Sequence, residues 1–77
     1  MKDKCDVLVD ARGLDCPLPL LKAKQALNRM ATGELLEIYA TDAGSVRDFA
    51  VFSEQSGHCL LSSEDRQGEY HYIIKKS

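Results

Sequence analysis

Two closely spaced prolines constrain this chain more than any other feature of its sequence. Pro17 and Pro19 are the only prolines, and both lie in the run Cys16 Pro17 Leu18 Pro19. Proline fixes φ and lacks a backbone N–H, so both residues fit the first turn of a helix but not a helix interior. An alternating apolar pattern at residues 6–10 ends before this run, and helical spacing begins after it. We therefore predict a strand, a turn and a helix that begins at Pro17.

Hydrophobic spacing predicts the other elements of secondary structure. Alternation of apolar and polar residues predicts four strands, at residues 6–10, 35–41, 59–64 and 69–75. Spacings of three and four residues predict two helices. The apolar face of the first consists of Leu20, Ala23, Leu27 and Met30. The face of the second consists of Val46, Phe49, Ala50 and Phe52.

Turn and capping signals place the ends of these elements. Gly33 suits the left-handed cap of the first helix, and Gly57 that of the second. Asp42 can cap the second helix directly, or the segment Ser45 to Asp48 can act as a capping box. The last two strands are joined by a predicted four-residue hairpin loop, residues 65–68.

The predicted element order is βαβαββ, which is typical of the α+β class. Right-handed crossovers then favour a two-layer α/β sandwich in which both helices pack on one face of a mixed four-stranded sheet. A chain of 77 residues has room for one small core, so residues 1–77 are expected to form a single domain. Such a domain can hardly enclose a large cofactor, and we expect its chemistry at the surface and no cofactor.

Composition narrows the possible functions. The net charge is -2, and no dense basic cluster reverses it locally, so we expect no direct contact with nucleic acid. No segment has the length of a signal-peptide core or a membrane span, which favours a cytoplasmic protein without a membrane partner. We also expect a monomer. The three widely spaced cysteines fit neither a disulfide framework nor a zinc knuckle, and no metal site is expected.

Cys16 is the candidate reactive residue. A cysteine at the N-cap of a helix faces unpaired backbone N–H groups and the positive end of the helix dipole, which stabilise the thiolate. Pro17 lacks a donor, so the N–H of Leu18 is the expected partner of the sulfur. Arg12 favours the thiolate and Asp15 opposes it, and we expect a modestly lowered pKa for Cys16. The alternative is a small residue that simply packs at a helix start.

The segment from Asp10 to Pro19 resembles the signature of the TusA/SirA/YedF sulfurtransferases. The resemblance runs along the whole chain and includes the later segments Thr41 Asp42, Arg47 Asp48 and Tyr70 to Lys76. It implies that Cys16 accepts sulfane sulfur as a persulfide and that neighbouring motif residues support it, namely Arg12, Gly13, Asp15, Pro17, Leu18 and Pro19. Some members have Glu where this chain has Leu18, which leaves the pathway open.

The resemblance also implies protein partners for Cys16. The donor would be a pyridoxal-phosphate cysteine desulfurase or a rhodanese-like protein, and acceptors would serve tRNA thiolation, molybdenum cofactor assembly or sulfur oxidation. An exposed Cys16 would need an apolar docking rim, for which the candidates are Leu14, Leu18 and Leu21. The cationic residues of the first helix could guide an acidic partner, namely Lys22, Lys24 and Arg29.

Two other functions remain as alternatives. A non-catalytic regulatory or RNA-binding module could use a similar fold with an incidental Cys16, although the acidic composition opposes RNA binding. A thiol-disulfide redox protein would need a second cysteine near Cys16, and only Cys5 and Cys59 are available. A metal site formed by Cys59, His58 and His71 is disfavoured, because adjacent strand residues point to opposite faces.

Overall fold

The computed structural model describes residues 5–77, so residues 1–4 of the predicted domain lie outside the described part. The element order βαβαββ is confirmed. The elements are β1 (Val7–Ala11), α1 (Leu18–Leu27), β2 (Leu35–Ala40), α2 (Ser45–Ser56), β3 (Cys59–Arg66) and β4 (Glu69–Lys75). Within residues 5–77, no helix has the length and apolar content needed to cross a bilayer.

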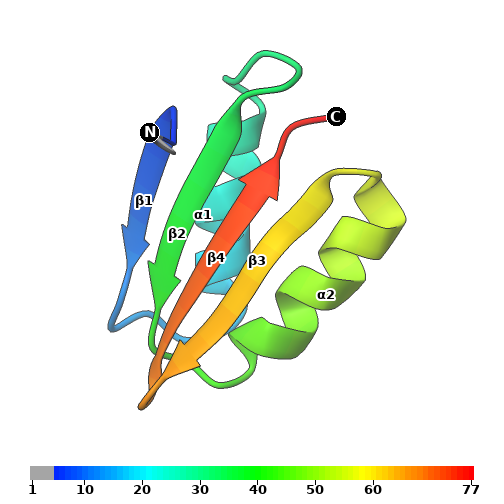
Figure 1. The fold of residues 1–77 in the computed structure, drawn as a ribbon. Coiled ribbons are helices and arrows are strands. Elements are labelled where there is room, and N and C mark those ends of the chain that lie inside the picture. The colour runs from blue at the N-terminus through cyan, green and yellow to red at the C-terminus, as the bar shows by residue number, and fades with distance from the viewer. Residues whose placement is uncertain (1–4) are drawn as a thin grey trace.

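The four strands form one mixed sheet in the order β1-β2-β4-β3 (Figure 1). β1 pairs parallel to β2, whereas β4 pairs antiparallel to both β2 and β3. β2 and β3 are therefore parallel to each other. The crossover from β1 to β2 through α1 and the crossover from β2 to β3 through α2 advance in the same direction across the sheet. Right-handed crossovers in one direction place both helices on the same face, as the sequence predicts. The result is the α+β sandwich expected from the element order.

One core fills the space between the sheet and the two helices. Tyr72 from β4 stacks on Phe49 from α2 with 4.5 Å between ring centroids. α1 contributes the buried residues Ala23 and Leu27, as its apolar spacing predicts. Ser45, at the start of α2, is buried as well and shares a 2.7 Å hydrogen bond with the Tyr72 hydroxyl. The start of α2 is therefore fixed to the centre of the sheet.

The predicted boundaries of α1 need correction. The helix begins at Leu18, with Pro17 as the N-cap and Pro19 inside the first turn. It ends at Leu27, well before Gly33, because the N–H groups of Arg29 and Met30 bond the carbonyls three residues earlier. These tighter bonds keep Met30 on the buried face although the regular helix has ended.

Other local predictions were also wrong. Of the predicted apolar face of α2, Phe49 is buried as predicted, but Val46 and Ala50 are exposed, because Ser45 turns toward the core together with Phe49. β3 continues to Arg66, so the hairpin loop contains two residues, Gln67 and Gly68, rather than four. Both have positive φ, at 58° and 89°, as a tight hairpin turn requires. The predicted left-handed cap at Gly57 is confirmed, with φ of 85°.

Candidate functional site

Cys16 lies in the loop between β1 and α1, beside the loop between β2 and α2. Because β1 and β2 are parallel, both loops leave the same edge of the sheet, where Ala11 pairs with Ala40. Gly13, at φ +82°, turns the first loop, and its N–H donates to Thr41 Oγ1 at 2.8 Å. The Cys16 N–H donates to Asp42 Oδ2 at 3.1 Å. Two hydrogen bonds thus hold the Cys16 loop against its neighbour.

The sulfur of Cys16 contacts a carboxylate on α2. Cys16 is exposed, and its Sγ donates to Asp48 Oδ2 at 2.5 Å. Gly44 packs behind the thiol, since a Cβ added there would lie 3.5 Å from Cys16 Cβ and 3.0 Å from Asp42 Oδ2. Cys16 therefore lies between two acidic residues, with the small Gly44 leaving the space for it.

The predicted capping role of Cys16 is wrong. Pro17 is the N-cap, no side chain caps the helix, and the N–H of Leu18 donates to Asp15 O at 2.8 Å. The Cys16–Pro17 peptide bond is cis. The Leu18 N–H, which we predicted to bond the sulfur, forms a backbone turn instead. The Cys16 thiol donates to Asp48.

The expected lowering of the Cys16 pKa is wrong for the same reason. The hydrogen bond to the Asp48 carboxylate raises the pKa of Cys16 from 9.0 to about 11. Desolvation and the negative charges of Asp48 and Asp42 act in the same direction. The thiol in this arrangement is protonated at neutral pH.

Arg12 does not supply the predicted positive charge to Cys16. Its hydrogen bonds end on Asp10, at 2.9 and 3.0 Å, and on Glu69, at 3.4 Å. The hydrogen bonds from Arg12 to Asp10 lower the pKa of the Asp10 carboxyl to about 2. Arg12 therefore ties the end of β1 to β4 instead of acting on the thiol.

The second proline of the motif and the three leucines of the predicted docking rim differ in burial. Pro19 is buried against the core, whereas Leu18 and Leu21 are 45% and 48% exposed. Leu14 is partly buried and packs against the core. Of the three leucines predicted as a docking rim, Leu18 and Leu21 are thus exposed, whereas Leu14 belongs to the periphery of the core.

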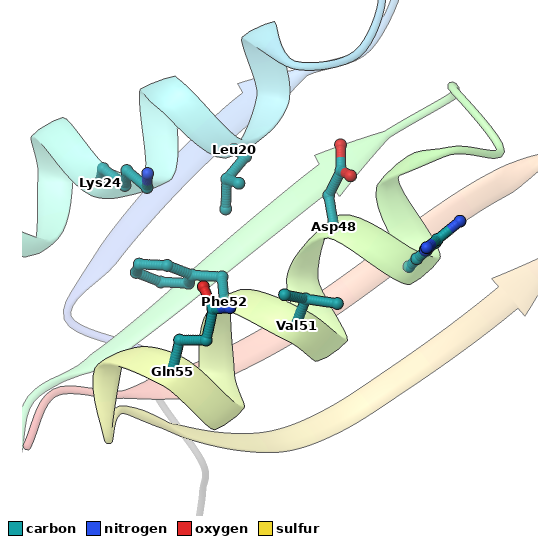
Figure 2. A pocket seen from close by; sticks show the side chains of 7 residues that line it. Leu20, Lys24, Asp48, Val51, Phe52 and Gln55 are labelled. Atoms are coloured by element: carbon teal, nitrogen blue, oxygen red, sulfur yellow. The ribbon is translucent and has the colours of Figure 1, made fainter.

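A groove runs between α1 and α2 and reaches Asp48 (Figure 2). Its volume is about 380 Å³. Its apolar part includes Phe52, whose ring lies 5.6 Å from Lys24 Nζ. The full lining consists of Leu20, Lys24, Arg47, Asp48, Val51, Phe52 and Gln55. Asp48 belongs to both this groove and the thiol contact.

The remaining candidate residues lie away from Cys16. Cys16 and Cys59 are free thiols, and Cys59 follows the far end of α2. His58 and His71 have separate partners, since His58 Nδ1 accepts from the Ser77 N–H and His71 Nε2 lies 2.6 Å from Glu37 Oε2. Among residues 5–77, no group of three or more His, Cys, Asp or Glu side chains is arranged to hold a metal ion.

Sequence reasoning missed the roles of Asp42 and Asp48. Both were interpreted as capping residues of α2, but the N-cap is Gly44 and makes no side-chain capping bond. The sequence signal for a different role was the pair of acidic residues flanking the start of the helix. Only the fold shows that both carboxylates turn toward Cys16.

Comparison with known proteins identifies the class. Residues 7–76 match the profile of the family described as sulfurtransferase TusA. The sulfur carrier protein TusA of Allochromatium vinosum is 50% identical over 72 residues, which cover 94% of this chain and 95% of that protein. The putative sulfur carrier protein YrkI of Bacillus subtilis is 38% identical over 73 residues, covering 95% and 97%.

A solved structure supports the fold. The SirA-like protein from Desulfitobacterium hafniense matches with a TM-score of 0.79 and 22% identity, over 90% of this chain and 95% of that one. The family model and the two relatives define the class, a family of small sulfur carrier proteins, and the solved structure shows the fold. The chain belongs to the TusA family of sulfurtransferases.

Proposed function

We propose that this protein carries sulfane sulfur as a persulfide on Cys16 and passes it from one protein to another. The observation that carries this proposal is the exposed Cys16 thiol, held by its backbone at a sheet edge in a chain of the TusA family. An exposed sulfur can enter the active site of another protein, which a relay requires. The loops around Cys16 hold it in position, and the partner proteins supply the other reacting groups.

The proposed transfer is a thiol exchange. The Cys16 thiolate attacks the terminal sulfur of a donor persulfide, and a new S–S bond forms on Cys16. The S–S bond of the donor breaks, and the donor cysteine leaves as a thiolate that takes up the proton lost by Cys16. An acceptor thiolate then attacks the terminal sulfur of the Cys16 persulfide in the same way. Neither step needs an external oxidant or reductant.

The proposed partners are proteins. A cysteine desulfurase or a rhodanese-like protein would load Cys16, and the acceptor would belong to tRNA thiolation, molybdenum cofactor assembly or sulfur oxidation. The exposed Leu18 and Leu21 form the apolar docking rim in this proposal. The cytoplasm, which keeps thiols reduced, is the proposed compartment.

Intact mass spectrometry tests the proposal. The chain is incubated with a cysteine desulfurase and cysteine, and in parallel with a rhodanese and thiosulfate. We expect a gain of about 32 Da, one sulfur atom, that thiol reductants remove. Cys16→Ser should abolish the gain, and the matched control Cys59→Ser should retain it. Absence of the adduct with both donors, or its persistence in Cys16→Ser, would contradict the proposal.

A further inference from the structure

Two carboxylates from one helix start hold Cys16 in place. Asp42, in the loop before α2, accepts the Cys16 N–H at 3.1 Å. Asp48, in the first turns of α2, accepts a hydrogen bond from the Cys16 thiol. Asp42 therefore fixes the backbone and Asp48 the side chain. α2 carries Asp48 and follows the loop with Asp42, and it is itself fixed by the buried Ser45, so Asp48 is attached to a rigid element.

We propose that Asp48 is a positioning residue that holds the unloaded Cys16 side chain as a neutral thiol, and that sulfur transfer begins only when this contact breaks. The inference rests on the proposed carrier function. A carboxylate next to a sulfur stabilises the proton on that sulfur, whereas the nucleophile in thiol exchange is the thiolate. The bonded position is therefore the unreactive one. An empty carrier in this state resists alkylation and oxidation between encounters with its donor.

The other charged groups around Cys16 do not reverse this effect. Asp15 precedes Cys16 in the same loop and is also acidic. Arg47 and Lys24 lie along the groove that Asp48 shares, but neither forms a hydrogen bond with Cys16 among the described residues. Arg12 is held by Asp10 and Glu69. Asp48 thus remains the group in direct contact with the thiol.

The pH profile of alkylation tests this inference on the isolated chain, without any sulfur donor. Iodoacetamide modification of the Cys16 peptide is followed by mass spectrometry across the alkaline range, so that the other cysteines are measured separately. In the wild type we expect the midpoint near the raised pKa of about 11. In Asp48→Asn the midpoint should fall by about one unit or more, which corresponds to about tenfold more thiolate at pH 8.

Three comparisons make the result specific. Asp48→Ala should shift the midpoint in the same direction, and it covers the case in which the Asn amide replaces the carboxylate as an acceptor. Glu54→Gln removes an equal charge from an exposed position on α2 and should leave the midpoint unchanged. Alkylation of Cys59 in each variant should match the wild type. Thermal unfolding curves of all variants establish that each is folded.

The outcomes separate this inference from the carrier function. A wild-type midpoint near that of an ordinary cysteine, or equal midpoints for wild type, Asp48→Asn and Asp48→Ala, would overturn the role of Asp48 even if Cys16 accepts sulfur. A shifted midpoint in both Asp48 variants supports that role even if no sulfur adduct forms with the tested donors. In the latter case the carrier proposal fails and the thiol contact stands.

Discussion

Cys16 Sγ lies 2.5 Å from Asp48 Oδ2, although the two residues are separated by 32 positions in the chain. The contact joins the loop after β1 to the first turns of α2. It also reverses the simplest expectation for a cysteine near a helix start, since the sulfur faces a carboxylate instead of backbone N–H groups. The environment of this thiol is therefore set by the helix beside it rather than the helix that follows it.

Replacing the exposed leucines should slow loading by a protein donor without unfolding the chain. Leu18→Ser and Leu21→Ser remove apolar surface that is already half exposed, so the unfolding free energy should change by about 0.5 kcal/mol or less. Persulfide loading by a cysteine desulfurase should fall about tenfold in kcat/KM if these side chains form the docking rim.

Two measurements control for this prediction. Inorganic polysulfide needs no protein docking, so it should load both leucine variants at the wild-type rate. Leu61→Ser removes a leucine that is 52% exposed on β3 and should leave desulfurase loading unaffected. Equal loading of all three variants by the desulfurase would place the docking surface elsewhere.

Gly44→Ala should disturb the backbone of Cys16. The new Cβ would lie 3.0 Å from Asp42 Oδ2, so the carboxylate has to shift by a few tenths of an ångström, which strains its hydrogen bond with the Cys16 N–H. Weakening of this hydrogen bond should cost up to about 1 kcal/mol of unfolding free energy, measured by urea denaturation. The Cys16 amide resonance in a nitrogen-15 NMR spectrum should shift upfield at the same time. An unchanged resonance would mean that Gly44 is not needed for space.

The buried hydrogen bond between Ser45 and Tyr72 should make a measurable contribution to stability. Tyr72→Phe leaves the Ser45 hydroxyl buried without its partner, which should lower the unfolding free energy by about 1–3 kcal/mol. The double variant with Ser45→Ala should recover part of this loss. Tyr70→Phe is the matched control, because no hydrogen bond of its hydroxyl is found among the described residues. A loss equal to that of Tyr72→Phe in this control would contradict the assignment.

Acid should weaken the fold through Glu37. On the sheet face away from the helices, Glu37 Oε2 lies 2.6 Å from Nε2 of the buried His71. This hydrogen bond, with a second from Tyr39, lowers the pKa of the Glu37 carboxyl below 4.5. A lowered carboxyl pKa contributes stability above the unfolded-state pKa and loses it as pH falls through the folded-state value.

Urea denaturation at a series of pH values checks this effect. The unfolding free energy of the wild type should decrease as pH falls below about 4.5, and Glu37→Gln should remove part of that dependence. Glu54→Gln, on the exposed surface of α2, should keep the wild-type dependence. A Glu37→Gln profile parallel to that of the wild type would show that this pair does not couple stability to pH.

Sequence patterns predict the buried face of a helix best where the residues of that face are apolar. The spacing of Ala23 and Leu27 identifies the buried side of α1 correctly, because apolar residues there follow the helical period. In α2 the buried position at the start is Ser45, a polar residue satisfied by Tyr72. Periodicity of apolar residues assigns that position to the surface and therefore misplaces the exposed Val46.

The chemistry at Cys16 depends on contacts between distant parts of the chain. The local signals at Pro17 and Pro19 locate the start of α1 and identify the cysteine. They carry no information on which residues of another loop and helix will lie beside the sulfur. Because Asp42 and Asp48 also fit helix-capping patterns, only the parallel pairing of β1 and β2 reveals their position next to the thiol.

The strand register also determines where the domain can be tethered. Val7, at the start of β1, and Ile74, near the end of β4, both pair with Leu36, so the chain enters and leaves at one edge of the sheet. Cys16 follows the opposite edge, where Ala11 pairs with Ala40. A linker or surface attachment before β1 or after β4 would therefore leave the thiol pointing outward, which suits immobilised assays and fusions that present it to a second enzyme.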